Sequence, residues 1–281
     1  MQPRTIFAVF AHPDDELSAG GTLARYAASG ANVTLVCVTR GEAGEISDPG
    51  LATPETLAEV RTQELLTAAK ALGLSDVRFL GFRDSGMVGT PENADARSFH
   101  QADPAEAIRR LVALIRSVKP DVVITHDVTG GYGHPDHLAA YRHVSAAFDA
   151  ASDPLQFPDE GPPWQPSRLF YTAMLRSFFQ KMRETLQAAG VDTSVFDRPE
   201  MQRLGYEAAD ITTTINVSDY TDAKQAGFRA HRTQFAADGP FSRLDAETQR
   251  AMFAYEHYIL ARPVDAGPVA ADDLFSYTPH G

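Results

Sequence analysis

Two hydrophobic periods alternate along the first half of the chain. Continuous apolar runs of strand length are followed by segments in which apolar residues recur every three or four positions. The runs predict strands over 5–11, 32–39, 77–81 and 121–125, and the segments predict helices over 20–29, 54–72, 103–118 and 134–151. Strands that are apolar on both faces and alternate with helices favour a parallel sheet of right-handed βαβ units. We therefore expect an α/β fold, a Rossmann-like three-layer sandwich with a mostly parallel sheet.

Residues typical of helix ends support these boundaries. Thr53 and Asp103 stand before the second and third predicted helices as N-cap candidates, and Pro104 follows in the first turn. Gly30 and Gly73 follow the first two helices, where glycine commonly ends a helix.

The pattern weakens after residue 150. Five prolines between residues 152 and 167 indicate a surface excursion. Beyond it the spacing predicts strands over 168–172 and 212–217 and helices over 175–189, 219–234 and 244–254. Because no second fold pattern and no internal repeat is present in the sequence, we expect one domain over 1–281. Its Rossmann-like core over 1–150 would carry a C-terminal elaboration over 151–281 that completes the site.

Composition narrows the classes of partner. With 25 Lys and Arg against 37 Asp and Glu, the formal charge is −12, which argues against nucleic acid or an anionic membrane as partner. The single cysteine, Cys37, excludes an intrachain disulfide and a Cys-based zinc site. No apolar run approaches the roughly 20 residues of a membrane span, and the apolar start is too short for a signal peptide. We expect a cytoplasmic protein, and the sequence leaves a homo-oligomer open.

Polar or glycine-rich loops follow all four predicted strands of the core, whereas the opposite ends of these strands are plain. The loops read AHPDDE over 11–16, TRGEAGE over 39–45, RDSGM over 83–87 and GGYGHPDH over 130–137. In open parallel sheets, ligands bind outside the carboxyl ends of the strands, where the strand order reverses. The sequence therefore predicts a ligand site at this edge of the sheet.

One imidazole and three carboxylates stand together after the first strand: His12, Asp14, Asp15 and Glu16. Such anions repel one another unless a cation lies among them, and His12 and Asp15, three positions apart, can point at one place. A second His-Pro-Asp segment holds His134 and His137 at the same spacing. A His/Asp/His set that leaves one position for water suits a catalytic zinc, and iron(II) would accept the same ligands.

An acidic helix N-terminus explains His-Pro-Asp-Asp equally well when that segment is taken alone. The second His-Pro-Asp-His, at another strand end, makes this coincidence hard to sustain, so we favour a metal site. Asp14 is then placed to take a proton from the water, and Tyr132 and His134 to stabilise an oxyanion. Asp136 is expected to hold His134 in its charged form.

At AHPDDE and HPDH the chain resembles the LmbE-like, or PIG-L, family of zinc-dependent N-acetylglucosamine de-N-acetylases. The similarity extends through TRGEAGE and RDSGM to FRAHRTQF over 228–235 and EHY over 256–258. RDSGM and GGYGHPDH are most similar to the mycothiol-pathway members, a deacetylase and an S-conjugate amidase. The resemblance implies hydrolysis of the N-acetyl amide of an N-acetylglucosamine-type small molecule, such as a thiol-precursor pseudo-disaccharide, to acetate and the free amine. Cleavage of sugar-linked thiol S-conjugates is the alternative.

The resemblance also implies roles for individual residues. It assigns zinc binding to His12, Asp15 and His137, and the general base to Asp14. His134 would help to stabilise the tetrahedral intermediate and protonate the amine, with Asp136 behind it, and Tyr132 matches a mobile tyrosine of the family. The residues expected to line the sugar pocket are Glu45, Arg61, Asp84 and Met87.

Several of these residues also have simpler explanations. Arg61 and Glu64 are spaced for an exposed helical salt bridge, Asp84 suits a turn, and His231 fits a core or surface position. The histidines expected to be structural or incidental are His100, His126, His257 and His280. A dinucleotide-binding oxidoreductase is disfavoured because no Gly-x-Gly-x-x-Gly follows the first strand. A noncatalytic sugar-binding protein would have no need for Asp14.

Overall fold

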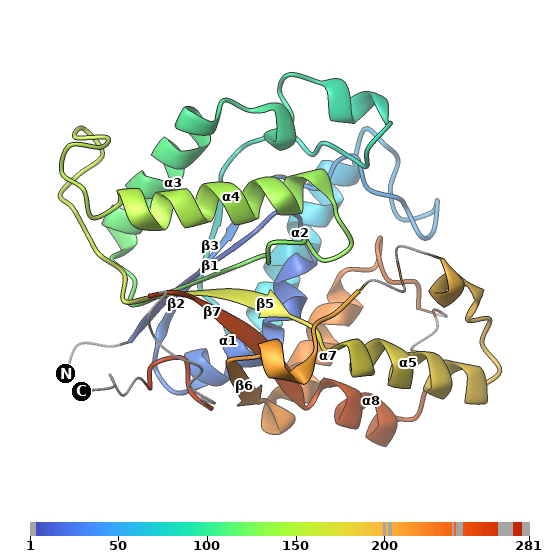
Figure 1. Ribbon diagram of the computed structural model, residues 1–281. Coiled ribbons are helices and arrows are strands. Elements are labelled where there is room, and N and C mark those ends of the chain that lie inside the picture. The colour runs from blue at the N-terminus through green and yellow to red at the C-terminus, as the bar shows by residue number, and fades with distance from the viewer. Residues whose placement is uncertain are drawn as a thin grey trace.

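A computed structural model describes residues 4–198, 201, 204–237, 239, 244–263 and 272–276, so His280 lies outside the described residues. Seven strands form one sheet in the order β3-β2-β1-β4-β5-β7-β6 (Figure 1). They are β1 (Thr5–Phe10), β2 (Asn32–Cys37), β3 (Asp76–Phe79), β4 (Val122–Thr125), β5 (Arg168–Ala173), β6 (Thr213–Asn216) and β7 (Tyr255–Arg262). Strands β1 to β5 pair in parallel, and β7 is antiparallel to both β5 and β6. The expected α/β fold with a mostly parallel sheet is confirmed.

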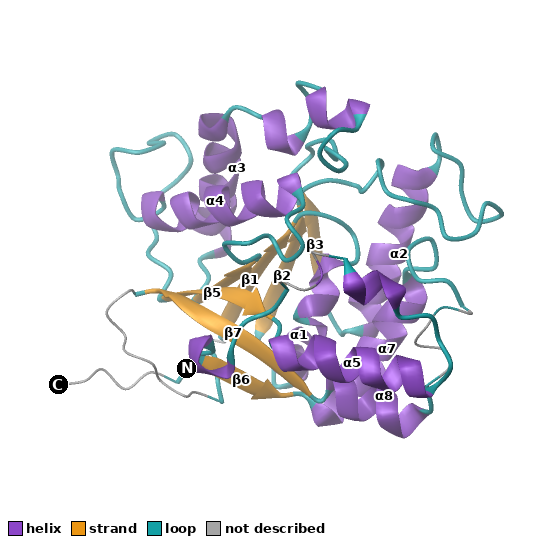
Figure 2. Ribbon diagram, turned by 45° about the vertical axis from the view of Figure 1, so that its right-hand side comes forward, coloured by secondary structure: helices purple, strands orange, loops and turns teal. Residues whose placement is uncertain are grey.

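Helices cover both faces of the sheet and make it a three-layer sandwich (Figure 2). One face carries α1 (Gly20–Ala28), α2 (Leu57–Ala71) and α7 (Thr221–Ala230), and the other carries α3 (Pro104–Val118) and α4 (Pro135–Ala150). Alternate residues of β1 serve the two faces, since Ile6 packs in the same cluster as Leu23 of α1, whereas Phe7 packs in that of Leu111 of α3. Both faces of β1 are therefore buried, as its continuous apolar run predicts.

The remaining helices lie to one side of the sheet. Helices α5 (Arg176–Ala188) and α8 (Ala246–Phe253) share a small cluster around Met182, Leu186 and Leu244. Short 3-10 helices occupy Asp15–Ser18, Pro91–Ala94, Phe99–Gln101, Ser194–Asp197, Ala208–Asp210 and Ser218–Tyr220. Within the part of the chain that the structure describes, no helix has the length and apolarity to cross a membrane.

The structure corrects three sequence expectations about element boundaries. The helix expected from residue 54 begins at Leu57, and its N-cap is Thr56 rather than the expected Thr53, because residues 53–56 form a turn of their own. The helix expected over 219–234 ends at Ala230, where His231 turns toward the sheet edge. Strand β7 is not predicted, since a charged residue, Glu256, occupies a buried position in it. The N-cap expected at Asp103 is confirmed, since its carboxylate accepts a hydrogen bond from the Ala105 amide.

The strand order reverses at β1 and β4. After β1 the chain leaves to α1 on one face of the sheet, and after β4 it leaves to α4 on the other face. Two neighbouring parallel strands whose connections diverge leave a crevice outside their carboxyl ends. The two His-Pro-Asp segments both begin at this point.

Candidate active site

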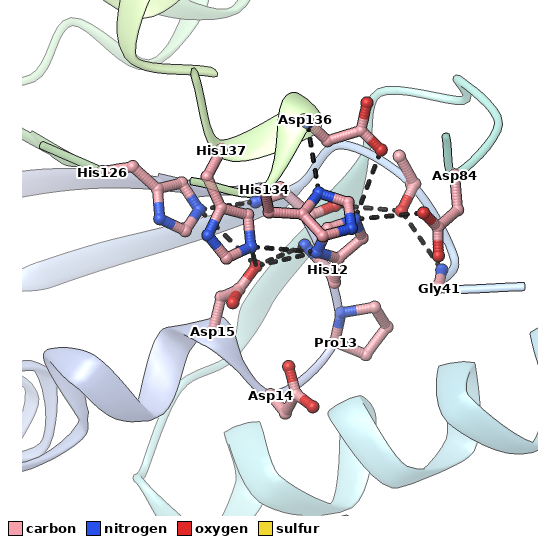
Figure 3. A network of polar contacts seen from close by, with 12 residues as sticks. His12, Pro13, Asp14, Asp15, Gly41, Asp84, His126, His134, Asp136 and His137 are labelled. Carbon is pink, nitrogen blue, oxygen red and sulfur yellow. Dashed lines mark hydrogen bonds and ion pairs between the residues drawn. The ribbon is translucent and has the colours of Figure 1, made fainter. Parts of the chain in front are cut away.

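The two His-Pro-Asp segments, whose histidines are 125 residues apart, meet at the carboxyl ends of β1 and β4 (Figure 3). His12 Nδ1 lies 3.3 Å from Asp15 Oδ2, and His137 Nε2 lies 3.2 Å from each of these two atoms. Zinc bonded at about 2.0–2.1 Å in a tetrahedron separates its ligand atoms by about 3.3 Å. The three side chains therefore have the spacing and the chemistry of one face of a tetrahedral zinc site.

Neighbouring groups fix the tautomers that this ligand set requires. His137 Nδ1 lies 3.1 Å from the Gly130 carbonyl, so Nδ1 carries the proton and Nε2 keeps its lone pair. His12 Nε2 lies 3.3 Å from a carboxylate oxygen of Asp84 and of Asp136, so Nε2 donates and Nδ1 is the free atom. Hydrogen bonds of this kind orient histidine ligands and raise their basicity. The free atoms are the two that face Asp15.

Other side chains lie close enough to join an ion. Two such sets replace part of the triad, His12/His134/His137 and Asp15/His126/His137, and a third consists of His12, Asp84 and Asp136. In the first two sets, the additional histidine already uses a ring nitrogen. His126 Nε2 accepts from the Ala11 amide, and His134 Nδ1 accepts from the Asp136 amide. We favour the set of His12, Asp15 and His137 because its three atoms lie 3.2–3.3 Å apart with one free nitrogen on each imidazole, and Asp15 Oδ2 can keep its bond from the His12 amide.

Charges around the triad are strongly coupled. Burial alone would lower the pKa of His12, but the carboxylates of Asp84, Asp136 and Asp15 outweigh it and raise the pKa. Burial alone would raise the pKa of Asp15, but His137, His126 and His12 outweigh it and lower the pKa. Asp15 is thus held as a carboxylate, the form that binds a cation.

The expected pairing of Asp136 with His134 is wrong. The Asp136 carboxylate accepts from the Ser85 and His100 amides, at 2.8 and 2.9 Å, and faces His12. His134 is instead the N-cap of α4. Burial, together with His12 and His137, lowers the pKa of His134 to about 3, so this imidazole is neutral at pH 7. A cap that accepts a backbone N–H leaves only its second ring nitrogen as a donor.

Asp14 stands beside the triad in a strained conformation. Its φ of 108° is uncommon for a residue with a side chain, and such strain costs about 1–3 kcal/mol unless the surroundings compensate. Glu16 accepts from the Asp14 amide at 2.8 Å, and Arg61 donates to the Asp14 carboxylate at 3.1 Å. Burial raises the pKa of Asp14 to about 6, although the charge of Arg61 opposes this.

Arg61 and Glu64 do not form the exposed salt bridge that their spacing suggests. Both are buried, and they have different partners. Arg61 also donates to the carbonyls of Pro13 and Gly41. Gly41, with φ +65°, leaves room for it, because a Cβ there would lie 2.2 Å from the guanidinium. A glycine after the second strand was therefore the sequence signal for a side chain that enters this loop.

Residues 231–234, which follow α7, form hydrogen bonds with residues in and beside the active-site loops. His231 is fully buried, with Nε2 2.6 Å from Glu16 Oε1, so it supports the residue that holds Asp14. Thr233 donates to Glu64 through its amide at 2.8 Å and through its hydroxyl. Gln234 donates to the Glu45 carbonyl at 2.9 Å. The sequence favoured a core or surface position for His231 over one that reaches the site, because nothing local to the helix indicates a partner 215 residues away.

The pairing of His231 with Glu16 predicts a pH-dependent loss of stability. Burial alone would lower the pKa of His231, but Glu16 and Asp14 outweigh it and raise the pKa. The charged pair therefore stabilises the fold fully below about pH 6.5, and this contribution disappears as the pH rises through the folded-state pKa. We expect His231→Gln to lower the free energy of unfolding by about 2 kcal/mol at pH 6 and by less at pH 9, measured by urea denaturation.

The matched control for this change is His257→Gln, because His257 is half-buried on β7 and bonds only the Thr214 hydroxyl among described residues. Because burial lowers the pKa of His257, any loss of stability in that variant should be larger at pH 9 than at pH 6, the opposite of His231→Gln. An equal loss at both pH values in His231→Gln would contradict a charged pair.

The remaining predicted residues lie around the mouth of the site. Tyr132 is half-exposed, with its ring centroid 5.3 Å from that of His137. Met87 is 43% exposed and Glu45 is exposed, whereas Asp84 is buried against His12 and the Gly86 amide. Contact of these residues, and of Arg61, with a sugar stays a prediction.

Sequence reasoning set His126 aside, but the structure places it within the cluster. Its ring stacks on that of His137 with centroids 4.1 Å apart, and its Nε2 lies 3.5 Å from Asp15 Oδ2. Its place at the end of the fourth strand was the available signal. Asp127 and Tyr206, which sequence reasoning did not consider, also reach the loop that carries Tyr132.

Comparison with known proteins agrees with this geometry. Residues 7–148 match the family model of the GlcNAc-PI de-N-acetylases, PIG-L. A 1D-myo-inositol 2-acetamido-2-deoxy-alpha-D-glucopyranoside deacetylase of Geodermatophilus obscurus is 39% identical, with 98% of each chain covered. An enzyme of that name from Acidothermus cellulolyticus is 42% identical over 97% of this chain and 94% of its own. The solved N,N'-diacetylchitobiose deacetylase of Pyrococcus horikoshii shares the fold, with a TM-score of 0.64 and 20% identity over 92% and 84%.

Proposed function

This chain belongs to the PIG-L family of GlcNAc-PI de-N-acetylases, and on that premise we propose that it is a zinc-dependent N-deacetylase of a small amino sugar. The substrate is 1D-myo-inositol 2-acetamido-2-deoxy-alpha-D-glucopyranoside, the molecule named in the relatives at about 40% identity. The products are acetate and the free amine. The observation that carries the proposal is the triangle of His12, Asp15 and His137 with Asp14 beside it.

The donor set fits zinc better than it fits a hard cation. Two imidazoles and one carboxylate suit zinc or iron(II), whereas magnesium and calcium take mainly oxygen ligands. When bound, zinc supplies Lewis-acid activation of a water molecule and of the amide carbonyl. The cytoplasmic location and any homo-oligomer stay predictions from the sequence.

The surrounding side chains divide the proton transfers. Asp14 accepts a proton from the water that attacks the acetamide carbonyl, and a pKa raised by burial to about 6 suits a base that works near neutral pH. Asp14 then returns this proton to the departing amine. This role falls to Asp14 because neutral His134 carries a single proton, on Nε2, which it donates in a hydrogen bond to the intermediate.

Tyr132 and His134 act on the oxygen of the tetrahedral intermediate. Burial raises the pKa of Tyr132, so its hydroxyl keeps its proton and donates a hydrogen bond. Neutral His134 donates from Nε2, because its Nδ1 accepts the Asp136 amide. Donors placed where charge develops contribute about 10²–10³-fold each to turnover in comparable acyl-transfer sites.

Release of the free amine from three substrates tests the proposed function, and acetate is the second product only for the two N-acetylated glycosides. The zinc-loaded enzyme is assayed on the inositol glycoside, on N-acetylglucosaminyl-malate and on a thiol S-conjugate of the deacetylated pseudo-disaccharide. We expect acetate and free amine from the inositol glycoside at a kcat/KM at least tenfold above the other two. Faster cleavage of the S-conjugate would assign the amidase activity instead. No acetate from either glycoside would overturn the assignment.

A further inference from the structure

A hydrogen bond joins the C-terminal part of the chain to the loop that carries Tyr132. The Tyr206 hydroxyl donates to Asp127 Oδ2 at 2.5 Å. Asp127 is the second residue after β4, next to His126, and it is only 5% exposed. Its other oxygen accepts from the Gly131 amide at 2.9 Å, and Thr129 donates its hydroxyl to Oδ2 at 2.8 Å. The Asp127 carboxylate thus ties Tyr206 to the loop over 128–133.

The loop itself has little intrinsic preference for one conformation. Gly130, Gly131 and Gly133 all have positive φ, of 63°, 66° and 87°. Glycine populates many backbone conformations and loses more entropy than other residues when it is fixed. Bonds from outside the loop are therefore needed to hold it. Asp127 supplies them, through the Gly131 amide and through its own carbonyl, which accepts from the Gly130 amide.

Backbone hydrogen bonds hold Tyr206 beside the residues that follow β5. Its amide donates to the Met174 carbonyl and its carbonyl accepts from the Arg176 amide, both at 2.9 Å. Gly205, with φ +83°, allows this close approach, because a Cβ there would lie 2.7 Å from the Arg176 nitrogen. Burial and the Asp127 carboxylate both raise the pKa of Tyr206, so its hydroxyl stays a donor. Both the backbone and the hydroxyl of Tyr206 are therefore held in place by hydrogen bonds.

Two groups of the proposed mechanism depend on the position of this loop. Tyr132 projects from it, and the Gly130 carbonyl contacts His137 Nδ1 at 3.1 Å. Among the described residues, Asp127 has no salt-bridge partner, so neutral donors alone stabilise its buried charge. Loss of one of them would loosen the carboxylate that organises the loop.

We infer that Tyr206 is a positioning residue for the deacetylation reaction: through Asp127 it fixes the loop over 128–133 and with it the hydroxyl of Tyr132. The inference rests on the proposed function for the role of Tyr132. The hydrogen bonds that fix the loop are independent of that function, so the two can be tested separately.

The test compares Tyr206→Phe with the wild-type holoenzyme. The change removes the hydroxyl and keeps the ring and the backbone bonds. We expect amide hydrogen exchange in peptides covering 128–134 to rise about tenfold, because the lost bond is to a charged group. We also expect kcat to fall about tenfold, with KM and zinc content changed less than twofold. Asp127→Asn should raise exchange in the same peptides.

Tyr171→Phe is the matched control, because Tyr171 also lies on β5 and its hydroxyl bonds Ser145, away from the loop. It should leave both exchange and kcat unchanged. In a Tyr132→Phe background, Tyr206→Phe should lower kcat less than twofold, since the hydroxyl that it positions is gone and Gly130 keeps the bond from its amide to the Asp127 carbonyl.

The outcomes separate the two proposals. Unchanged exchange in 128–134, or an equal loss of kcat in the presence and absence of the Tyr132 hydroxyl, would overturn the role of Tyr206. Faster exchange with unchanged kcat would overturn it as well. An inactive wild-type enzyme would contradict the proposed function, while the exchange measurement would still report whether Tyr206 holds the loop.

Discussion

Replacing Asp14 by asparagine should lower kcat by about two to four orders of magnitude while the bound metal remains, because the variant lacks the base and keeps the ligands. Asparagine, like aspartate, tolerates positive φ better than most residues with a side chain, so it can adopt the 108° of Asp14 without added strain. Its amide can still contact Arg61 or accept a hydrogen bond, and the backbone bond to Glu16 is kept. The loss would therefore report proton transfer rather than misfolding.

Steady-state kinetics and elemental analysis check this result together. We expect the zinc content of Asp14→Asn to equal that of the wild type. Asp48→Asn is the control, since it removes one exposed carboxylate from the loop between β2 and α2. Wild-type kcat in Asp14→Asn would remove this carboxylate from the mechanism. Joint loss of zinc and activity would make Asp14 a ligand.

Changes at the metal ligands should have the second large effect. We expect His12→Ala and His137→Ala to lose zinc on dialysis and to retain less than about one thousandth of wild-type kcat/KM, because two ligands do not hold the ion in a catalytic geometry. His126→Gln should keep zinc, since His126 uses Nε2 to accept the Ala11 amide and a glutamine carbonyl can accept the same bond.

Metal content by elemental analysis decides between the overlapping ligand sets. His100→Ala is the control for loss of an imidazole, because that side chain is exposed while its amide alone contacts Asp136. Loss of zinc in His126→Gln but not in His12→Ala would favour the set of Asp15, His126 and His137. Chelation should abolish activity in the wild type, and added zinc should restore it.

The core of the fold could be predicted because its signals are local. Strands β1, β2 and β4 are mainly apolar runs, β3 is a short segment between a helix and a polar loop, and each of the first four helices has an apolar face, so order and type follow from the residues themselves. Strand β7 could not be predicted in this way. Glu256 occupies a buried position in it because the carboxylate accepts from the Gly21 and Thr22 amides at the start of α1, a partner that no local pattern reveals.

The site shows the same division. Spacing placed His12 and Asp15 together, and the position of both His-Pro-Asp segments at strand ends placed His137 with them. The contacts behind them were not predictable from spacing. Asp136 lies two positions after His134 in sequence yet faces His12, and Arg61 reaches Asp14 instead of Glu64, because the crevice between β1 and β4 brings distant loops closer than helical neighbours.

The hydrogen bonds of His231 and its neighbours with the site imply an order in which the parts of the site are synthesised. His12, Asp15 and His137 all leave the ribosome well before His231 and Tyr206, which contact Glu16 and Asp127. A nascent chain that has not yet reached residue 231 therefore holds all three proposed ligands but lacks the imidazole that braces Asp14 through Glu16.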